Sequence, residues 1–443
     1  MRLAILKQNR GTRLFPNCPE WDNVPPAMTR NRYRPSALLL LGISLVVLLG
    51  AGWCTAADSS SLDLALVGGT VYVSPTAAPM QDAVILIHEG KIQTVGKRGA
   101  VKVPKSAKVI DCAGKVIVAG FWNSHVHFTE PVWQNAATAP AAPLEQHMQE
   151  MLTRWGVTTA FDLGSNPEDT FALRKRIAEG SVAGPKIYMA GDIFPRNGIP
   201  VYLPAGPAYP QAGTPEEAKG LAMSYMSSGF DAVKLFTGSY QGNKPVIDMS
   251  EPVAQAAVEV AHAHGKPVFT HPQDRAGEDN ALAAGVDVLA HTIPEEGEYT
   301  KDELMRMKAQ HTALIPTLTL WEVVMQGAAE DVTQRFIQAG VNELKSYFDE
   351  GGTILFGTDV GFTQHYDTAE EYVLMSKSGM GWRDILASLT TNPARFFKAE
   401  HTGQLTVGDE GDVVVLDADP SGDVRNFARV DYTIRAGKVI YRK

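Results

Sequence analysis

Residues Val118–Phe128 read V-A-G-F-W-N-S-H-V-H-F and decide the fold of this chain. The stretch is apolar and closes on two histidines, His125 and His127, which is typical of a buried strand whose last residues reach a polar site. Because residues i and i+2 of a strand point to the same face, both imidazoles can bind one metal ion. Two histidines with purely structural roles would give the same pattern, so the interpretation depends on what the other strands carry.

The composition is that of a globular protein with a small-molecule substrate. The chain has 443 residues, of which 44% are apolar and 20% charged, enough for one large domain and a small one. Its formal charge of −9 argues against a nucleic-acid partner, because no basic face is available to displace counterions from phosphates. The oligomeric state is left open, a homo-oligomer included.

The N-terminal part of the chain is predicted to lie outside the fold. Ser36–Trp53 is an apolar run that follows Arg30, Arg32 and Arg34 and precedes small residues, the pattern of a secretory signal. If it is not cleaved, the run is long enough to span a bilayer, so a membrane anchor is the alternative. Either way we expect the catalytic part to be exported, periplasmic or secreted. Met28 stands where such a signal would begin, so the true start is open.

Both ends of the remaining chain have the pattern of short strands. Leu62–Lys115 shows alternating apolar runs broken by Gly and Pro, and the same pattern returns in Asp412–Asp417 and Tyr432–Tyr441. Neither end has enough strands for a stable sheet alone, so we expect both to form one small β-sandwich. The predicted divisions are 1–57 (signal or extension), 58–117 (β-sandwich, N-terminal part), 118–400 (barrel) and 401–443 (β-sandwich, C-terminal part).

The middle of the chain alternates strand-like runs with amphipathic helix patterns, which predicts a (β/α)8 TIM barrel inserted into the terminal β-sandwich. The clearest helix patterns are Leu144–Trp155, Thr214–Ser228 and Glu251–His264. The candidate strands are Trp122–Phe128, Val157–Leu163, Lys186–Gly191, Ala232–Phe236, Pro267–His271, Val286–His291, Ala313–Leu318 and Thr353–Thr358.

Chemistry in such barrels lies at the C-terminal ends of the strands. Besides the two histidines of the first strand, the predicted strand ends carry Lys234 on the fourth, His271 on the fifth, His291 on the sixth and Asp359 after the eighth. All but the lysine are standard ligands of a divalent metal. The alternatives are histidines that cap strands in the core, a lysine whose stem covers apolar surface, and an aspartate that caps a helix.

With these residues the chain resembles the amidohydrolase superfamily, in particular its two-metal branch with a carboxylated lysine. The similarity extends to the imidazolonepropionase-related group, which includes Xaa-Pro dipeptidases and N-acyl amino acid hydrolases. The resemblance implies two divalent ions, zinc in our prediction, and a carbamate made from CO2 on Lys234 that bridges them. It also implies that His125 and His127 bind one ion, that His271 and His291 bind the other, and that Asp359 contacts a metal and is the catalytic proton shuttle.

The function implied is hydrolysis of an amide or peptide-like C–N bond in a small molecule by a metal-bridged hydroxide. Cyclic amides, lactones and phosphoesters remain alternative substrates, because fold and metals do not determine which bond is cleaved. A non-catalytic amidohydrolase-like binding protein is the alternative of another class, and it would be expected to lack some of the ligands.

Substrate contacts are expected on the loops that follow the strands, the longest of which follows the third strand. Arg196, Tyr202, Tyr240 and Arg275 are candidates for binding a substrate carboxylate through charge-assisted hydrogen bonds. His365, in the last of these loops, is a further candidate for contact with the substrate.

Overall fold

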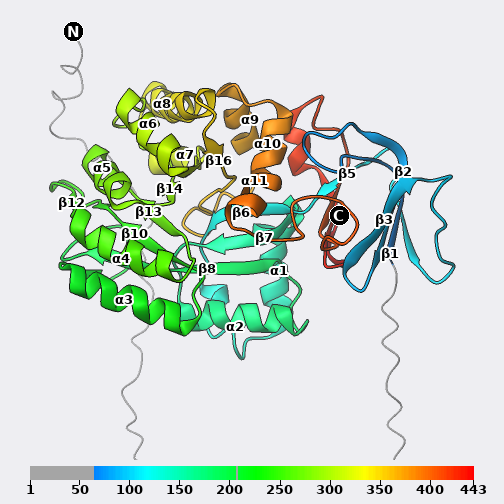
Figure 1. Cartoon of the computed structure of the whole chain (residues 1–443), viewed down its shortest axis with the longest axis horizontal. Helices are drawn as coiled ribbons and strands as arrows, with labels where there is room; N and C mark the ends of the chain where they lie inside the picture. The colour runs from blue at the N-terminus through cyan, green and yellow to red at the C-terminus, as the bar shows by residue number, and fades with distance from the viewer. Residues whose placement is uncertain (1–63, 206–207) are drawn as a thin grey trace, which may run out of the picture.

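The computed structural model describes residues 64–205 and 208–443. Its larger part is a barrel of eight parallel strands surrounded by helices, and a separate sheet lies at one side (Figure 1). Each barrel strand pairs with the next along the chain, which confirms the predicted fold class. The barrel strands are β6 (Phe121–Val126), β7 (Val157–Asp162), β8 (Lys186–Pro195), β10 (Ala232–Phe236), β13 (Val268–His271), β14 (Val288–Ala290), β15 (Ala313–Ile315) and β16 (Thr353–Ile354).

Hydrogen bonds beyond the end of β16 join the last strand to the first. The amide of Ser124 donates to the carbonyl of Phe356 at 2.7 Å, and the amide of Asp359 donates to the carbonyl of His125 at 2.9 Å. Further along, the amide of His127 donates to the carbonyl of Val360 at 2.8 Å. The closure of the barrel therefore brings the two histidines of β6 beside Asp359.

Three barrel strands are much shorter than predicted. The predicted strand Val286–His291 is reduced to β14, Ala313–Leu318 is reduced to β15, and Thr353–Thr358 is reduced to β16. Left-handed backbone follows the first two. His291 has φ 61° and Thr317 has φ 42°, values at which a strand cannot continue.

Helix α3 (Pro215–Ser228) begins and ends at recognisable caps. α3 begins after Thr214, whose side chain accepts from the amide of Glu217 in a capping box, and ends before Gly229, which has φ 85°. The first predicted helix is wrong at its end, because the backbone of Leu152 leaves the helical region and a short 3-10 turn, η3 (Thr153–Trp155), follows. The helices are α1 (Ala141–Met151), α2 (Pro167–Ala178), α3 (Pro215–Ser228), α4 (Glu251–Ala263), α5 (Arg275–Ala284), α6 (Lys301–Gln310), α7 (Leu320–Val324), α8 (Glu330–Asp349), α9 (Ala369–Lys377), α10 (Trp382–Leu389) and α11 (Thr391–Phe396).

Aromatic side chains fill one end of the barrel. Trp122 stacks on Tyr188 with ring centroids 5.6 Å apart and on Phe397 at 5.7 Å. Phe161 packs on Phe269 at 4.7 Å and on Phe397 at 5.1 Å. Phe397 follows α11, so the chain after the last barrel strand returns to plug the barrel. The polar residues at the strand ends therefore lie above a packed, water-excluding floor.

Strands from both ends of the described chain form one sheet, which confirms that the two ends combine as predicted for the terminal β-sandwich. The central contact is the antiparallel pair of β5 (Val116–Ala119) and β17 (Val413–Leu416). Gly68, with φ 91°, lies where β1 changes partner from β4 to β5. The sheet runs in the order β19 (Lys438–Arg442), β18 (Val430–Arg435), β17, β5, β1 (Leu64–Val71), β2 (Met80–His88) and β3 (Lys91–Lys97), with β4 (Lys108–Asp111) also paired to β1.

The predicted signal or anchor Ser36–Trp53 lies outside the described residues, so export and membrane attachment stay predictions. Within 64–205 and 208–443, no helix is both long and apolar enough to cross a bilayer.

Candidate metal centre

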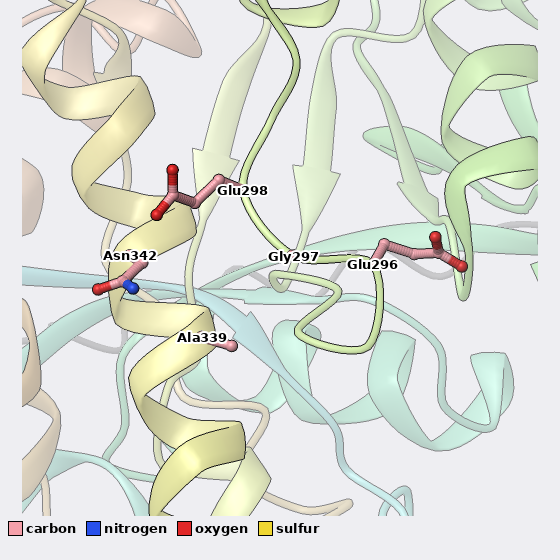
Figure 2. A pocket seen from close by; sticks show the side chains of 5 residues that line it. All are labelled: Glu296, Gly297, Glu298, Ala339 and Asn342. Carbon is pink, nitrogen blue, oxygen red and sulfur yellow. The ribbon is translucent and has the colours of Figure 1, made fainter. Parts of the chain in front are cut away.

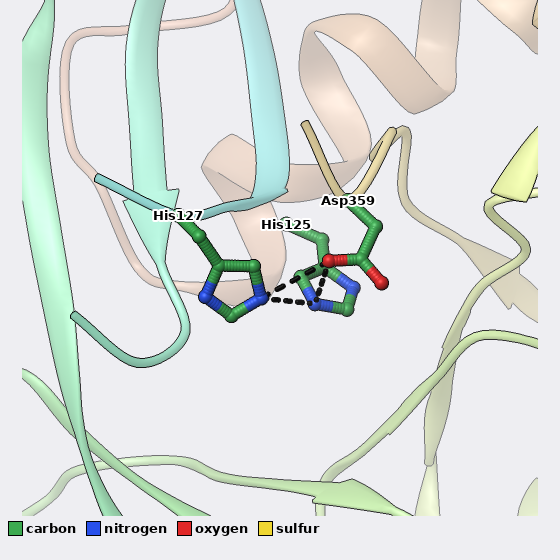
Figure 3. Close-up of side chains that lie close together, drawn as sticks. All are labelled: His125, His127 and Asp359. Carbon is green, nitrogen blue, oxygen red and sulfur yellow. Dashed lines mark hydrogen bonds and ion pairs between the residues drawn. The ribbon is translucent and has the colours of Figure 1, made fainter. Parts of the chain in front are cut away.

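His125, His127 and Asp359 form a compact cluster at the C-terminal end of the first and last barrel strands (Figure 3). Their ligand atoms all lie within 4.8 Å of one another. The Nε2 atoms of the two histidines are 3.2 Å apart, and Asp359 Oδ1 lies 3.0 Å from that of His127 and 3.2 Å from that of His125. Asp359 Oδ1 is buried, yet no described residue makes a well-aligned hydrogen bond to it. Two nitrogens and one oxygen therefore face a common point.

His271 and His291 form a second cluster: His271 ends β13, and His291 directly follows the neighbouring strand β14. His291 Nε2 lies 2.6 Å from His271 Nδ1, and the ring centroids are 4.4 Å apart. The ring of His291 also lies 6.2 Å from the ring of His125, centroid to centroid, so the two clusters are adjacent. The structure thus brings together the four histidines that the sequence analysis selected.

Carbonyl oxygens orient three of these rings through the ring nitrogens that point away from the centre. His127 Nδ1 lies 2.7 Å from the carbonyl oxygen of Gly164, and His291 Nδ1 lies 3.2 Å from that of Thr292. His271 Nε2 lies 3.1 Å from Oε1 of Gln273. Since a carbonyl oxygen only accepts, each of these ring nitrogens carries a hydrogen, and in the neutral ring the opposite nitrogen presents a lone pair to the centre.

Burial and neighbouring charges shift the pKa values of the four rings in different directions. Burial and then the charge of Lys234 hold the pKa of His125 well below its usual value, and the same two causes lower that of His271 to about 4. Burial and then the charge of His271 hold the pKa of His291 well below its usual value. Burial also lowers the pKa of His127, but the Asp359 carboxylate outweighs it and raises the pKa overall.

Lys234 lies on β10 with only 2% of its surface exposed. Burial lowers the pKa of its amine to about 8, although the charges of Asp359 and Asp192 raise it. The amine also interacts electrostatically with His125, and with His271 and His291. Lys234 is therefore coupled to both histidine clusters, and a substantial fraction of its amine is neutral near pH 8.

Left-handed backbone marks the ends of several strands around the centre. Gln273 has φ 58°, His291 has φ 61° and Asp359 has φ 56°. For residues other than glycine this conformation costs on the order of 1 kcal/mol or more and tends to gather at functional sites. The strain therefore coincides with the residues that face the centre.

Asp192 is a carboxylate near the centre that the sequence analysis did not single out. It is the register partner of Lys234 on the adjacent strand β8. Burial raises its pKa to about 7, although the charges of His127 and Lys234 lower it. Its buried Oδ1 makes no hydrogen bond within the described part of the chain. Asp192 directly follows Gly191, the predicted end of the third strand. The rule that chemistry lies at the C-terminal ends of the strands could therefore have identified it.

Gly361 holds the loop that follows Asp359 against the first strand. It has φ 99°, and a Cβ atom there would collide with the carbonyl oxygen of His127. We expect Gly361→Ala to lower the free energy of unfolding by roughly 2 kcal/mol or more, because strain and collision add. Gly297→Ala is the matched control, since Gly297 has φ 78° with no atom within 4 Å of its would-be Cβ, and it should cost about 1 kcal/mol. Equal losses in chemical denaturation would contradict the contact with His127.

Acidic partners bind the two arginines proposed as substrate contacts. Arg275 Nη1 donates to Glu303 at 2.6 Å, and its Nη2 donates to the carbonyl of Glu296 at 3.0 Å. Arg196 forms an ion pair with Glu217. Both guanidinium groups therefore have structural partners, and their proposed contact with substrate stays a prediction.

The other proposed substrate contacts lie on loops beyond the strand ends. The ring of Tyr202 packs edge to face on Phe362, with centroids 5.3 Å apart. The carbonyl of Tyr240 accepts from the amide of Val201 at 3.1 Å. His365 is exposed in the loop between Asp359 and α9. Their roles toward a substrate also stay predictions.

A hollow of about 550 Å³ lies elsewhere, between α8 and the loop that follows β14 (Figure 2). None of the four histidines, Lys234 or Asp359 lines it. Its lining residues are Glu296, Gly297, Glu298, Ala339 and Asn342.

The sequence profile of the amidohydrolase family matches residues 116–440 of this chain. An ochratoxinase of Aspergillus niger is 23% identical over 433 residues, covering 86% of this chain and 88% of the ochratoxinase. An allantoinase of Solibacter usitatus is 24% identical over 396 residues, covering 77% and 82% of the two chains. A solved Xaa-Pro dipeptidase with bound methionine in the active site shares the fold, with a TM-score of 0.73, 22% identity and coverage of 86% and 100%. The profile match spans most of the chain and includes every residue of the two clusters, so the protein belongs to the amidohydrolase family.

Proposed function

We propose that the protein is a metal-dependent hydrolase that cleaves an amide or peptide-like C–N bond in a small molecule. The relatives named as ochratoxinase, allantoinase and Xaa-Pro dipeptidase support hydrolysis of C–N bonds. We further propose that the site binds two divalent cations, that these are zinc, and that Lys234 carries a carbamate. The observation that carries the proposal is the arrangement of the buried imidazoles.

The facing nitrogens of His271 and His291 are better suited to binding a cation than to contacting each other directly. Both nitrogens of the 2.6 Å contact present lone pairs, and the lowered pKa values leave both rings neutral at neutral pH. Two lone pairs repel at this distance unless a positive charge lies beside them. Imidazole nitrogen is a preferred ligand of zinc, so the pair has the donors that such an ion requires.

The cluster of His125, His127 and Asp359 fits a second cation. Its three donors face one another, and the Asp359 carboxylate raises the pKa of His127, which indicates that positive charge is favourable here. A divalent ion would supply that charge and would engage the buried Asp359 Oδ1. One carboxylate and two imidazoles are a common ligand set for zinc.

Lys234 has the properties of an amine that reacts with CO2. Its lowered pKa, caused by burial, provides the neutral nucleophile. The amine nitrogen would form a bond to the carbon of CO2 and release one proton to solvent, leaving a carbamate with one negative charge. The two carbamate oxygens suit a residue that interacts with both histidine clusters.

Asp359 would move the proton in the proposed reaction. Divalent ions at this site supply Lewis acidity, which acidifies water and polarises a carbonyl group. Asp359 accepts the proton of the attacking water while the new C–O bond forms at the carbonyl carbon. It then delivers this proton to the leaving nitrogen as the C–N bond breaks. Two contacts hold this carboxylate in place: its Oδ1 lies beside the Nε2 atoms of His125 and His127, and the amide of Asp359 donates to the carbonyl of His125.

The proposal is tested with purified protein supplied with zinc and bicarbonate. N-acyl amino acids, dipeptides, cyclic imides, lactones and phosphoesters form the substrate panel. We expect two metal ions per chain and hydrolysis of amides, with both lost after chelation and both restored by metal. Undiminished hydrolysis by fully metal-free protein would overturn the proposal, and hydrolysis of lactones or phosphoesters alone would select an alternative substrate class.

Gln273 is expected to support metal binding by orienting His271. Replacing it with methionine preserves size but removes the acceptor for His271 Nε2. Removal of such a supporting hydrogen bond lowers metal affinity by roughly 10- to 100-fold. Competition with a chromogenic chelator measures this loss. Gln334→Met on the exposed face of α8 is the control and should leave the affinity unchanged. An unaltered affinity in Gln273→Met would remove this role.

A further inference from the structure

Two aromatic residues connect loops from different sides of the barrel mouth. Tyr202 belongs to the loop after β8 and Phe362 to the loop after β16, and their rings meet at 5.3 Å with an interplanar angle of 67°. We call this pair the aromatic bridge. In the closed barrel, β6 and β7 lie between β16 and β8. The aromatic bridge therefore spans the ends of these two strands, where His125 and His127 lie.

Phe362 lies at the tip of a tight turn that begins at Asp359. The amide of Thr363 donates to the carbonyl of Asp359 at 3.1 Å, and the hydroxyl of Thr129 donates to the carbonyl of Gly361 at 2.7 Å. The turn is thus fixed beside the proposed catalytic carboxylate. The side chain of Phe362 is nevertheless 39% exposed, so it does not serve as core.

The loop that follows Asp359 is also anchored further along the chain. The hydroxyl of Tyr366 donates to Glu130 Oε1 at 2.9 Å, and His147 Nε2 lies 2.5 Å from Glu130 Oε2. Glu130 belongs to the loop after the first strand, so this contact fixes the position of the Phe362 turn from its other side. The exposed ring is therefore held in place rather than free to fold away.

Two hydrogen bonds also fix the loop that carries Tyr202. The amide of Val201 donates to the carbonyl of Tyr240 at 3.1 Å, and Gln241 Nε2 donates to the carbonyl of Ile199 at 3.0 Å. These bonds tie it to the loop after β10, the strand of Lys234. Val201 is 58% exposed beside Tyr202. The mouth thus presents a fixed apolar surface, and a group that covers it gains the free energy of removing apolar area from water.

We propose that the substrate carries a large apolar group, aromatic or branched aliphatic, on the nitrogen side of the scissile amide, and that this group packs on the aromatic bridge. This inference rests on the proposed function. The nitrogen side follows from the turn itself, because Asp359 delivers the proton to the leaving nitrogen and Phe362 lies three positions further on. Among the substrates of the proposed function, this selects N-acyl amino acids and dipeptides whose released amino acid has a large apolar side chain.

The test compares kcat/KM for N-acetylphenylalanine, N-acetylalanine and N-benzoylglycine in the metal-loaded full chain. We expect the wild type to prefer N-acetylphenylalanine over N-acetylalanine by about tenfold or more. Phe362→Ala should remove most of this preference, because it should lower kcat/KM for N-acetylphenylalanine about tenfold more than for N-acetylalanine. Phe362→Leu should retain part of it. Met305→Ala is the matched control, since Met305 is 63% exposed on α6 and should change neither substrate.

Several results would overturn the inference. Equal kcat/KM for the two N-acetyl substrates in the wild type would do so, as would a Phe362→Ala variant that slows both equally. A preference for N-benzoylglycine that Phe362→Ala removes would place the apolar group on the acyl side and contradict the assignment.

A measurement of ligand binding tests this inference even if the proposed function fails. If no amide of the panel is hydrolysed, the proposed function fails, yet calorimetry with free phenylalanine and alanine still decides the inference. Tighter binding of phenylalanine that is lost in Phe362→Ala supports the apolar contact. Equal binding of the two amino acids overturns it.

Discussion

Asp359→Asn is expected to lower kcat for amide hydrolysis by roughly 10²- to 10⁴-fold, the range that a positioned proton-transfer group contributes. Asparagine has the size of aspartate and keeps one oxygen beside His125 and His127, whose Nε2 atoms lie 3.2 and 3.0 Å from Asp359 Oδ1. An amide cannot accept the proton of the attacking water, so turnover should fall while the metal stays. Steady-state kinetics and metal analysis of the same preparation measure both quantities.

A neighbouring aspartate provides the control for this change. Asp367 is exposed in the same loop, where its Oδ1 accepts from the amide of Ala369 at 2.8 Å. Asp367→Asn should leave kcat within about twofold, as expected for a surface position. Full activity in Asp359→Asn would disprove the proton-transfer role. Loss of metal together with activity would instead make Asp359 chiefly a ligand.

Lys234→Ala is expected to abolish measurable turnover and to lower the metal content. The side chain is buried and coupled electrostatically to His125, His271 and His291, so its carbamate would be shared by both metal positions. Loss of the Lewis acid removes several kcal/mol of transition-state stabilisation, equivalent to at least about 10³-fold in rate. Metal analysis and kinetics measure the two effects.

Chemical rescue distinguishes a role of the carbamate from a role of the lysine side chain alone. Lys234→Ala leaves a cavity within the barrel that a short carboxylic acid can enter. Propionate should restore part of the metal content and activity, because its carboxylate supplies two oxygens in place of the carbamate oxygens. Propionamide has the same shape without the charge and should restore nothing. Wild-type activity in Lys234→Ala without any addition would exclude a role for the lysine.

The positions facing the centre could be predicted because each lies on a predicted strand or directly follows one. His125, His127 and Lys234 lie on or beside strands with strong apolar patterns, and His271 ends another. In a parallel barrel these ends meet at one rim, so spacing along the chain predicts proximity. The lengths of β14 and β15 could not be predicted, because the left-handed backbone after them gives no apolar pattern to read.

The supporting residues could not be found in the same way. Gln273 and the Gly164 carbonyl act only through the orientation of a ring nitrogen, and Asp192 only through its position beside Lys234. The partner of Arg275 likewise depends on how α5 packs on α6, since Glu303 lies on the other helix. These are pairwise contacts between distant segments, and residue type alone does not encode them.

By itself, the sequence determined the barrel, the joint terminal sheet and the residues at the strand ends, because strand periodicity and chain order restrict which side chains can reach the rim. The tertiary structure decided which ring nitrogens face one another, which arginines are already paired and that Tyr202 meets Phe362 across the mouth. The reason is physical: the apolar pattern specifies which face of an element is buried, whereas distances between polar atoms depend on backbone conformation and on the packing of loops at the barrel mouth.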